Sequence, residues 1–201
     1  MNTRGSVSRP RRLVAALLAL LLVGAFAAQA NAEALRAGVF EPPRDAPDFT
    51  LQGSNGNLLR LSAYRGRVVV LAFGFTSCPA ICPTTLATLA RMRKDLGDDA
   101  KDVQVVYVTV DPQRDTVEKL KAFLGAFDPA FAGGTGTEEQ LAAVRKDYGV
   151  DAKKVEAGDS YAYVHSSYTY FVDQAGKLRA LMPYGHGADD YVHDARILLG
   201  E

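Results

Sequence analysis

The sequence predicts an α/β fold, a three-layer sandwich built on a mixed sheet. Two near-continuous apolar segments, 68–75 and 103–110, are rich in β-branched residues, as is typical of strands buried on both faces of a parallel sheet. A third segment, 163–172, is aromatic and β-branched, and a turn at 173–176 joins it to an extended segment at 177–182. That pair indicates an antiparallel hairpin. The sheet is therefore expected to have a parallel half and an antiparallel half.

The remaining elements follow from turns and capping residues. Short extended segments at 49–51 and 58–61 flank a turn that contains glycine and asparagine. Helical spacing and capping residues predict four helices, over 83–96, 115–127, 137–148 and 191–199. The order strand, helix, strand, two helices, hairpin and helix matches a thioredoxin-like fold.

The first 32 residues have the pattern of an export signal. Four arginines precede an apolar run of 16 residues, 13–28, and small residues with Ala-x-Ala spacing follow it. We expect a signal peptide over 1–32, with an uncleaved membrane anchor as the alternative, although 16 residues fall short of the ~20 that cross hydrocarbon. Residues 33–47, rich in proline, arginine and alanine, are expected to form a linker or tether, and residues 48–201 a single domain.

Composition excludes several classes of protein. Hydrophobic residues make up 48% and charged residues 23%, which excludes a disordered chain and a polytopic membrane protein. Lys plus Arg and Asp plus Glu are 23 each, so there is no basic excess to bind nucleic acid. An export signal predicts the periplasm or the outer face of the cytoplasmic membrane. In such an oxidising compartment, two nearby cysteines can form a disulfide.

The two cysteines lie where a buried strand is expected to give way to a helix. Ligands bind at this carboxyl edge of the sheet in open α/β folds. Because the first helical turn has unpaired N–H groups, we expect the pKa of Cys78 and Cys82 to fall below the free value of ~8.5. Residues four apart on a helix are roughly 5–6 Å apart at Cβ. That separation suits a metal ion or, with adjustment, a redox-active disulfide; the alternatives are a purely structural disulfide or two buried thiols.

Two thiolates need a further ligand to complete a metal site. Thiolate sulfur selects Cu(I), with zinc as the usual competitor. The chain has three histidines. His165 begins the 163–172 segment, which is expected beside the strand at 68–75, and it is therefore favoured. His186 in a glycine-flanked loop and His193 on the last helix are the alternatives.

Other polar segments receive simpler interpretations. Asp111 and Asp115 could form a carboxylate pair, but we interpret them as a turn residue before proline and a helix cap. The glycine-rich segment 133–136 lacks the glycine spacing and the preceding strand of a phosphate-binding loop.

Three segments resemble the Sco (SenC) family of copper proteins. They are Phe-Thr-Ser-Cys-Pro-Ala-Ile-Cys-Pro with Cys78 and Cys82, Val-Thr-Val-Asp-Pro-Gln-Arg-Asp-Thr with Asp111, and His-Ser-Ser-Tyr-Thr-Tyr-Phe-Val-Asp from His165. The resemblance covers about 46–199. It implies a thioredoxin-like fold with an added hairpin and copper ligands at Cys78, Cys82 and His165. Many members carry an acidic residue just before the ligand histidine, where this chain has valine.

The resemblance also implies a function. A copper chaperone of the cell envelope, not an enzyme, would deliver copper for assembly of the dinuclear copper centre of cytochrome c oxidase. We expect a monomer whose partners are the copper-receiving oxidase subunit and a thiol–disulfide reductant. The alternative is a thiol–disulfide reductase that keeps the oxidase subunit's copper-ligand cysteines reduced. A thiol peroxidase is disfavoured, because the glutathione-peroxidase pattern includes a Trp and this chain has none.

Overall fold

The computed structural model describes residues 33–200. The expected signal peptide or anchor over 1–32 lies outside the described residues. Within residues 33–200, no helix combines the length and the apolar character that a membrane span requires.

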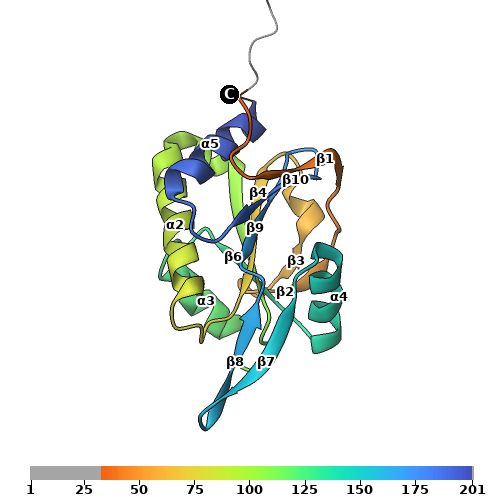
Figure 1. The fold of residues 1–201 in the computed structure, drawn as a ribbon, viewed down its shortest axis with the longest axis vertical. Coiled ribbons are helices and arrows are strands. Elements are labelled where there is room, and N and C mark those ends of the chain that lie inside the picture. The colour runs from red at the N-terminus through yellow and green to blue at the C-terminus, as the bar shows by residue number, and fades with distance from the viewer. Residues whose placement is uncertain (1–32, 201) are drawn as a thin grey trace, which may run out of the picture. The chain divides into compact units, whose positions relative to one another are not determined.

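An eight-stranded mixed sheet is the centre of the fold (Figure 1). Across the sheet, the strands are β1 (Gly38–Asp45), β10 (Lys177–Pro183), β9 (Tyr168–Val172), β4 (Val68–Gly74), β5 (Val103–Thr109), β6 (Ala132–Thr135), β2 (Thr50–Gly53) and β3 (Leu58–Arg60). Strands β4, β5 and β6 run parallel, and β9 pairs antiparallel with β4. The predicted division into a parallel and an antiparallel half is confirmed.

Helices cover both faces of this sheet. They are α2 (Ile81–Leu96), α3 (Val117–Gly125), α4 (Glu138–Tyr148) and α5 (Ala188–Leu199), at the predicted places with shifted ends. Helices α2, α3 and α5 pack on one face and α4 on the other (Figure 1). Every residue of β4 and β5 is buried, because both faces of these apolar strands are covered. The thioredoxin-like three-layer sandwich is confirmed.

Capping residues set the ends of the shorter helices. Thr137 and Gln140 form the capping box expected at the start of α4, and Gly149 ends that helix in the left-handed conformation. The cap of α3 is Thr116, whose hydroxyl accepts a hydrogen bond from the amide of Lys119 at 3.2 Å. The prediction that Asp115 caps this helix is therefore wrong.

Part of the expected linker is a strand. Strand β1 pairs antiparallel with β10, with a shift in register between Val39 and Arg44. Nearly all of its residues are exposed, and prolines interrupt it, so the sequence lacks the apolar alternation that reveals a strand. The linker prediction for residues 38–45 is wrong for this reason.

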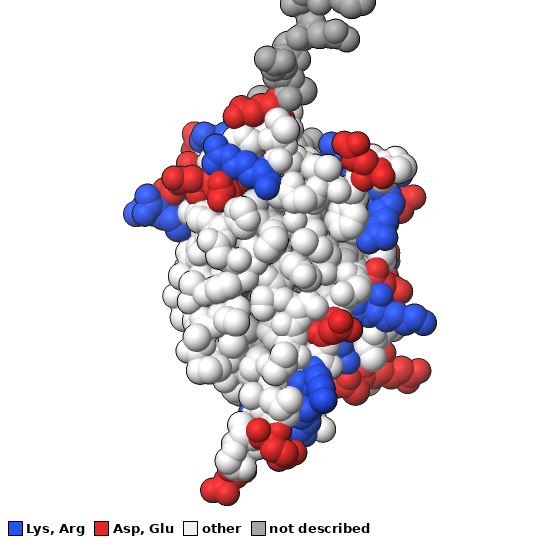
Figure 2. All heavy atoms as spheres, viewed as in Figure 1, with Lys and Arg blue, Asp and Glu red and all other residues white. Residues whose placement is uncertain are grey.

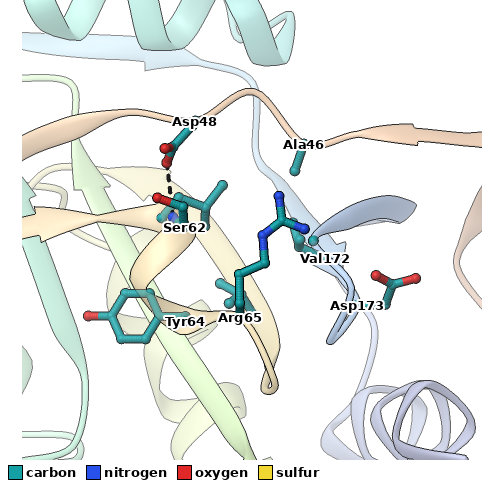
Figure 3. Close-up of a pocket in the computed structure, with 10 residues that line it drawn as sticks. Ala46, Asp48, Ser62, Tyr64, Arg65, Val172 and Asp173 are labelled. Carbon is teal, nitrogen blue, oxygen red and sulfur yellow. Dashed lines mark hydrogen bonds between the residues drawn. The ribbon is translucent and has the colours of Figure 1, made fainter.

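The chain that follows β1 is fixed at the amino end of β4. A carboxylate oxygen of Asp48 accepts a hydrogen bond from the amide of Ser62 at 2.9 Å (Figure 3). The Arg65 guanidinium extends between Ala46 and Val172, beside a cavity of about 20 Å³ (Figure 3). This cavity lies at the opposite end of β4 from the two cysteines.

The segment 163–172 is two strands rather than one. It breaks at residues 166–167, where the Ser166 amide donates a hydrogen bond to the Asp151 carbonyl at 2.9 Å. Strand β8 (Ser160–His165) pairs with β7 (Ala152–Ala157) in a separate two-stranded sheet. That hairpin is the addition to the fold, and only β9 lies beside β4 as expected. The glycine-rich segment 133–136 contributes to strand β6.

Candidate metal centre

Cys78 and Cys82 lie at the carboxyl end of β4, where the chain turns into α2. The amide of Cys82 donates a hydrogen bond to Cys78 Sγ at 3.4 Å. Both cysteines are free thiols; Cys82 is 3% exposed and Cys78 is half-buried. Pro83 fits the first helical turn because its missing N–H has no intrahelical partner there. One sulfur is thus inside the protein and the other is accessible at the rim.

His165 ends β8 and lies against the buried cysteine. Its Nε2 is 3.8 Å from Cys82 Sγ, although the residues are 83 positions apart. Its Nδ1 is 2.9 Å from the Ser166 carbonyl oxygen. Because a carbonyl oxygen only accepts hydrogen bonds, we assign the proton to Nδ1, which leaves the Nε2 lone pair free. The Phe75 and His165 rings pack in a T-shaped arrangement with 6.0 Å between their centroids. The imidazole is therefore held in the tautomer that ligates a metal through Nε2.

Burial controls the ionisation of both donors. It raises the pKa of the Cys82 thiol to about 12, despite the opposing effects of the Phe75 backbone and the Tyr107 hydroxyl. The expected lowering of the pKa is wrong for Cys82, because desolvation outweighs the helix terminus. Burial also lowers the pKa of His165, against the effect of its hydrogen bond to Ser166. Without metal, both groups are neutral at pH 7.

A glycine and a tyrosine surround the buried sulfur. A Cβ on Gly74 would lie 2.7 Å from Cys82 Sγ and would collide with the Tyr107 hydroxyl, so the space requires glycine. Tyr107 is 1% exposed, and its hydroxyl has no hydrogen-bond partner within the described part of the chain. That hydroxyl nevertheless lowers the pKa of Cys82, so its proton favours the thiolate. A thiolate bound to metal would satisfy this buried donor.

Neither Gly74 nor Tyr107 was predicted from the sequence as part of the site. The only available signal for Tyr107 was a hydroxyl within an apolar strand. The signal for Gly74 was a glycine inside another buried strand, because such a glycine often marks a place where another group lies close to the backbone.

The structure joins some of the expected ligands and separates others. Cys82 and His165 are in contact. Cys78 precedes α2 rather than lying on it, so the expected helical spacing of the two cysteines is not observed, but its sulfur accepts the hydrogen bond of the Cys82 amide. No group of three His, Cys, Asp or Glu side chains within residues 33–200 is already arranged as a metal site. Binding through all three expected ligands would therefore require their side chains to move closer together. The Nδ1 atoms of His186 and His193 are instead 2.9 Å from carboxylate oxygens of Asp190 and Asp194.

Asp115 is a buried acceptor that ties the cysteine loop to β5. One of its carboxylate oxygens accepts hydrogen bonds from the Thr76 amide at 3.0 Å and the Thr109 hydroxyl at 2.6 Å. Its other oxygen accepts one from the Thr76 hydroxyl at 2.5 Å. Lys119 Nζ lies 3.8 Å away. Asp115 therefore fixes the backbone two residues before Cys78.

Asp111 anchors the hairpin that carries His165. The buried Asp111 carboxylate accepts hydrogen bonds from the Tyr161 hydroxyl at 2.9 Å and from Arg114 Nε. The Arg114 guanidinium lies 3.8 Å from the Tyr161 ring centroid and donates to the Tyr161 carbonyl at 2.9 Å. Asp111 does lie in a turn, as its backbone contacts show, but its side chain has this further role. These contacts fix β8 four residues before His165.

Loss of the Tyr161 hydroxyl should loosen this anchor. We expect Tyr161→Phe to lower the free energy of unfolding by about 1–2 kcal/mol, because a buried carboxylate loses one donor. It should also weaken Cu(I) binding several-fold, since the strand carrying His165 is less restrained. Chelator competition and urea unfolding measure the two effects. Tyr163→Phe is the control, because no hydrogen bond from its hydroxyl occurs within residues 33–200. Equal behaviour of the two variants would contradict the anchor.

Comparison with known proteins gives a family for this combination of fold and residues. The family model described as SCO1/SenC matches residues 40–200. An SCO2-like protein of Rickettsia felis is 38% identical over 133 residues, which are 65% of this chain and 65% of that protein. The chain thus matches just under two thirds of that relative's length.

Solved structures give the same family. Arabidopsis thaliana ScoI with copper bound matches with a TM-score of 0.72 and 28% identity, over 78% of this chain and 99% of that chain. BsSco, described as a Sco-family cytochrome c oxidase assembly protein with a disulfide switch, matches with a TM-score of 0.66 and 25% identity. That match covers 80% of this chain and 97% of BsSco.

Proposed function

The chain belongs to the SCO1/SenC family, and from that premise we propose that it is a copper chaperone. It binds copper through Cys78, Cys82 and His165 and delivers it for assembly of the dinuclear copper centre of cytochrome c oxidase. The observation that carries the proposal is the 3.8 Å approach of His165 Nε2 to Cys82 Sγ. The copper bound to Arabidopsis ScoI and the description of BsSco as an oxidase assembly protein support it.

The donor set fits copper. Two thiolate sulfurs and one imidazole nitrogen suit Cu(I) in a trigonal site, and Cu(II) would take a further water or backbone ligand. The space kept by Gly74 and the unpaired Tyr107 hydroxyl favour a thiolate at Cys82. Cys78 lies at the rim, so a partner's thiols can reach the cargo and replace the ligands one at a time.

Copper binding competes with protons at the thiols. Because burial raises the pKa of Cys82 to about 12, its thiol is protonated at pH 7 and must release that proton to bind. Affinity therefore falls as pH falls, by about tenfold per pH unit for each proton released. Burial lowers the pKa of His165, so the imidazole is already neutral and adds little to this dependence near pH 7.

Oxidation provides a way to empty the site. When a partner disulfide accepts two electrons and two protons from Cys78 and Cys82, these cysteines form a disulfide and the partner becomes a dithiol. A thiol–disulfide reductant reverses the exchange. We place the protein in the periplasm or at the outer face of the cytoplasmic membrane as a monomer, with residues 1–32 as its export signal or tether.

Mixing the Cu(I)-loaded protein with the metal-free copper-receiving domain of the oxidase tests delivery. We expect copper to move to that domain, because exchange between thiolates needs no free ion, and metal analysis after separation measures it. A protein that reduces a disulfide in the domain but transfers no copper would contradict delivery. That result would leave the thiol–disulfide reductase function in its place.

A further inference from the structure

From the surface beside Cys82 and His165 we infer how the partner docks. This surface receives an uncharged segment of the copper-receiving protein, so apolar contacts and hydrogen bonds rather than ion pairs hold the complex together. The inference rests on the proposed function and extends it to the chemistry of the partner. It assigns the docking to residues that do not bind copper.

Three uncharged parts of the sequence meet on this side of the molecule. Residues 76–90, 160–172 and 180–187 contain no Lys, Arg, Asp or Glu. They form the start of α2, the β8–β9 region and the loop before α5. Figure 2 shows a wide uncharged surface over α2, whereas charged side chains gather near α5, α4 and the β7–β8 hairpin.

A groove connects this surface to the copper donors. Its volume is about 260 Å³, and none of its lining residues is Lys, Arg, Asp or Glu. Five of the nine are serine or threonine, and Tyr184 and His186 lie among the others. It shares Thr85, Ser167 and Thr169 with the smaller cavity that Cys82 and His165 line. A segment that lies in the groove therefore ends beside the metal donors.

Exposed apolar side chains border the same region. Within the described residues, six large hydrophobic side chains are exposed, and four of them belong to these uncharged parts. They are Ile81, Val164, Tyr168 and Tyr184, with exposed fractions of 38%, 65%, 40% and 47%. Ile81 and Tyr168 line the cavity beside the donors and Tyr184 lines the groove, whereas Val164, next to His165 on β8, faces the other side of that strand. Depletion of charge and enrichment in tyrosine are features of the centres of protein interfaces. Such a cluster on one side marks an interaction site.

The chemistry of transfer identifies what covers this surface. Ligand exchange brings the acceptor's donor atoms into direct contact with the ion, so the copper acceptor must approach the cysteine loop and the groove that opens beside it. A charged segment in that groove would lose hydration without gaining a counter-ion. His186, which lines the groove, has its Nδ1 2.9 Å from the Asp190 carboxylate, and Arg36 pairs with the same carboxylate at 3.0 Å.

A charge placed in the groove should block docking without changing the metal site. We expect Tyr184→Glu to weaken the complex with the oxidase's copper-receiving domain by roughly tenfold or more, the range of interface hot spots. Its Cu(I) affinity should equal that of the wild type. Calorimetry of metal-free and copper-loaded protein measures docking, and chelator competition measures copper binding. Tyr184→Phe should bind the domain as the wild type does.

Salt and a distant charge provide the decisive controls. Raising NaCl from 50 to 500 mM should change the wild-type Kd by about threefold or less, whereas docking through ion pairs would change it much more. Leu58→Glu, at a residue 71% exposed on edge strand β3, should dock normally. The inference would be overturned if the wild type did not bind the domain or if its Kd depended steeply on salt. Equal losses of affinity for the domain in the two Glu variants would also overturn it. Loss of wild-type Cu(I) binding with normal docking would instead overturn the proposed function.

Discussion

Replacing His165 with alanine is expected to weaken Cu(I) binding by roughly 100-fold or more. Even groups that only hydrogen-bond a metal-binding histidine contribute about 10–100-fold to affinity, and here one of three proposed ligands is removed. The Ser166 carbonyl orients the ring so that Nε2 faces Cys82, and no other histidine shares this position. Competition with a Cu(I) chelator under anaerobic conditions measures the change.

His186→Ala is the matched control for this substitution. His186 also has its Nδ1 held 2.9 Å from an acceptor, the Asp190 carboxylate, but it lies in the loop before α5. We expect its removal to leave Cu(I) affinity unchanged. Wild-type affinity in His165→Ala, with native thermal unfolding in both variants, would remove His165 from the copper site.

Replacing Asp115 with alanine is expected to cost about 3–5 kcal/mol of the free energy of unfolding. The change leaves the Thr76 amide and the hydroxyls of Thr76 and Thr109 without their acceptor. The Thr109 hydroxyl is buried and the two Thr76 donors are partly buried. A buried donor left unsatisfied costs about 1–3 kcal/mol. Because Thr76 precedes Cys78 by two residues, Cu(I) affinity should fall as well. Urea unfolding followed by circular dichroism measures the loss of stability.

Asp95→Ala is the control, because it removes a carboxylate that lies on the surface instead of one that is buried. Asp95 pairs with the exposed Arg91 on α2, and such surface pairs contribute about 0–1 kcal/mol. If Asp115→Ala were no more destabilising than Asp95→Ala, the buried network would not hold the cysteine loop.

The central part of the fold could be predicted because its signals are local. The apolar runs of β4 and β5 specify strands buried on both faces, and the capping box at Thr137 marks the start of α4. Strand β1 gave no such signal, because an exposed edge strand needs no apolar alternation. The break between β8 and β9 was hidden because aromatic residues continue on both sides of it.

The candidate donors could be named from the sequence, but their surroundings could not. The spacing of Cys78 and Cys82 is visible in the chain, and the resemblance to the Sco family pointed to His165. The pKa of Cys82 was predicted in the wrong direction, because a helix terminus is local whereas burial depends on the whole fold. For the same reason Asp115 was interpreted as a cap, although tertiary contacts make it a buried acceptor.

X-ray absorption of the anaerobic, Cu(I)-loaded protein tests the central claim most directly, because it counts the atoms bonded to the metal. Three proposed ligands predict two sulfur neighbours and one nitrogen neighbour, with the nitrogen absent in His165→Ala. A wild-type spectrum that contains two sulfurs and no imidazole nitrogen would contradict the account.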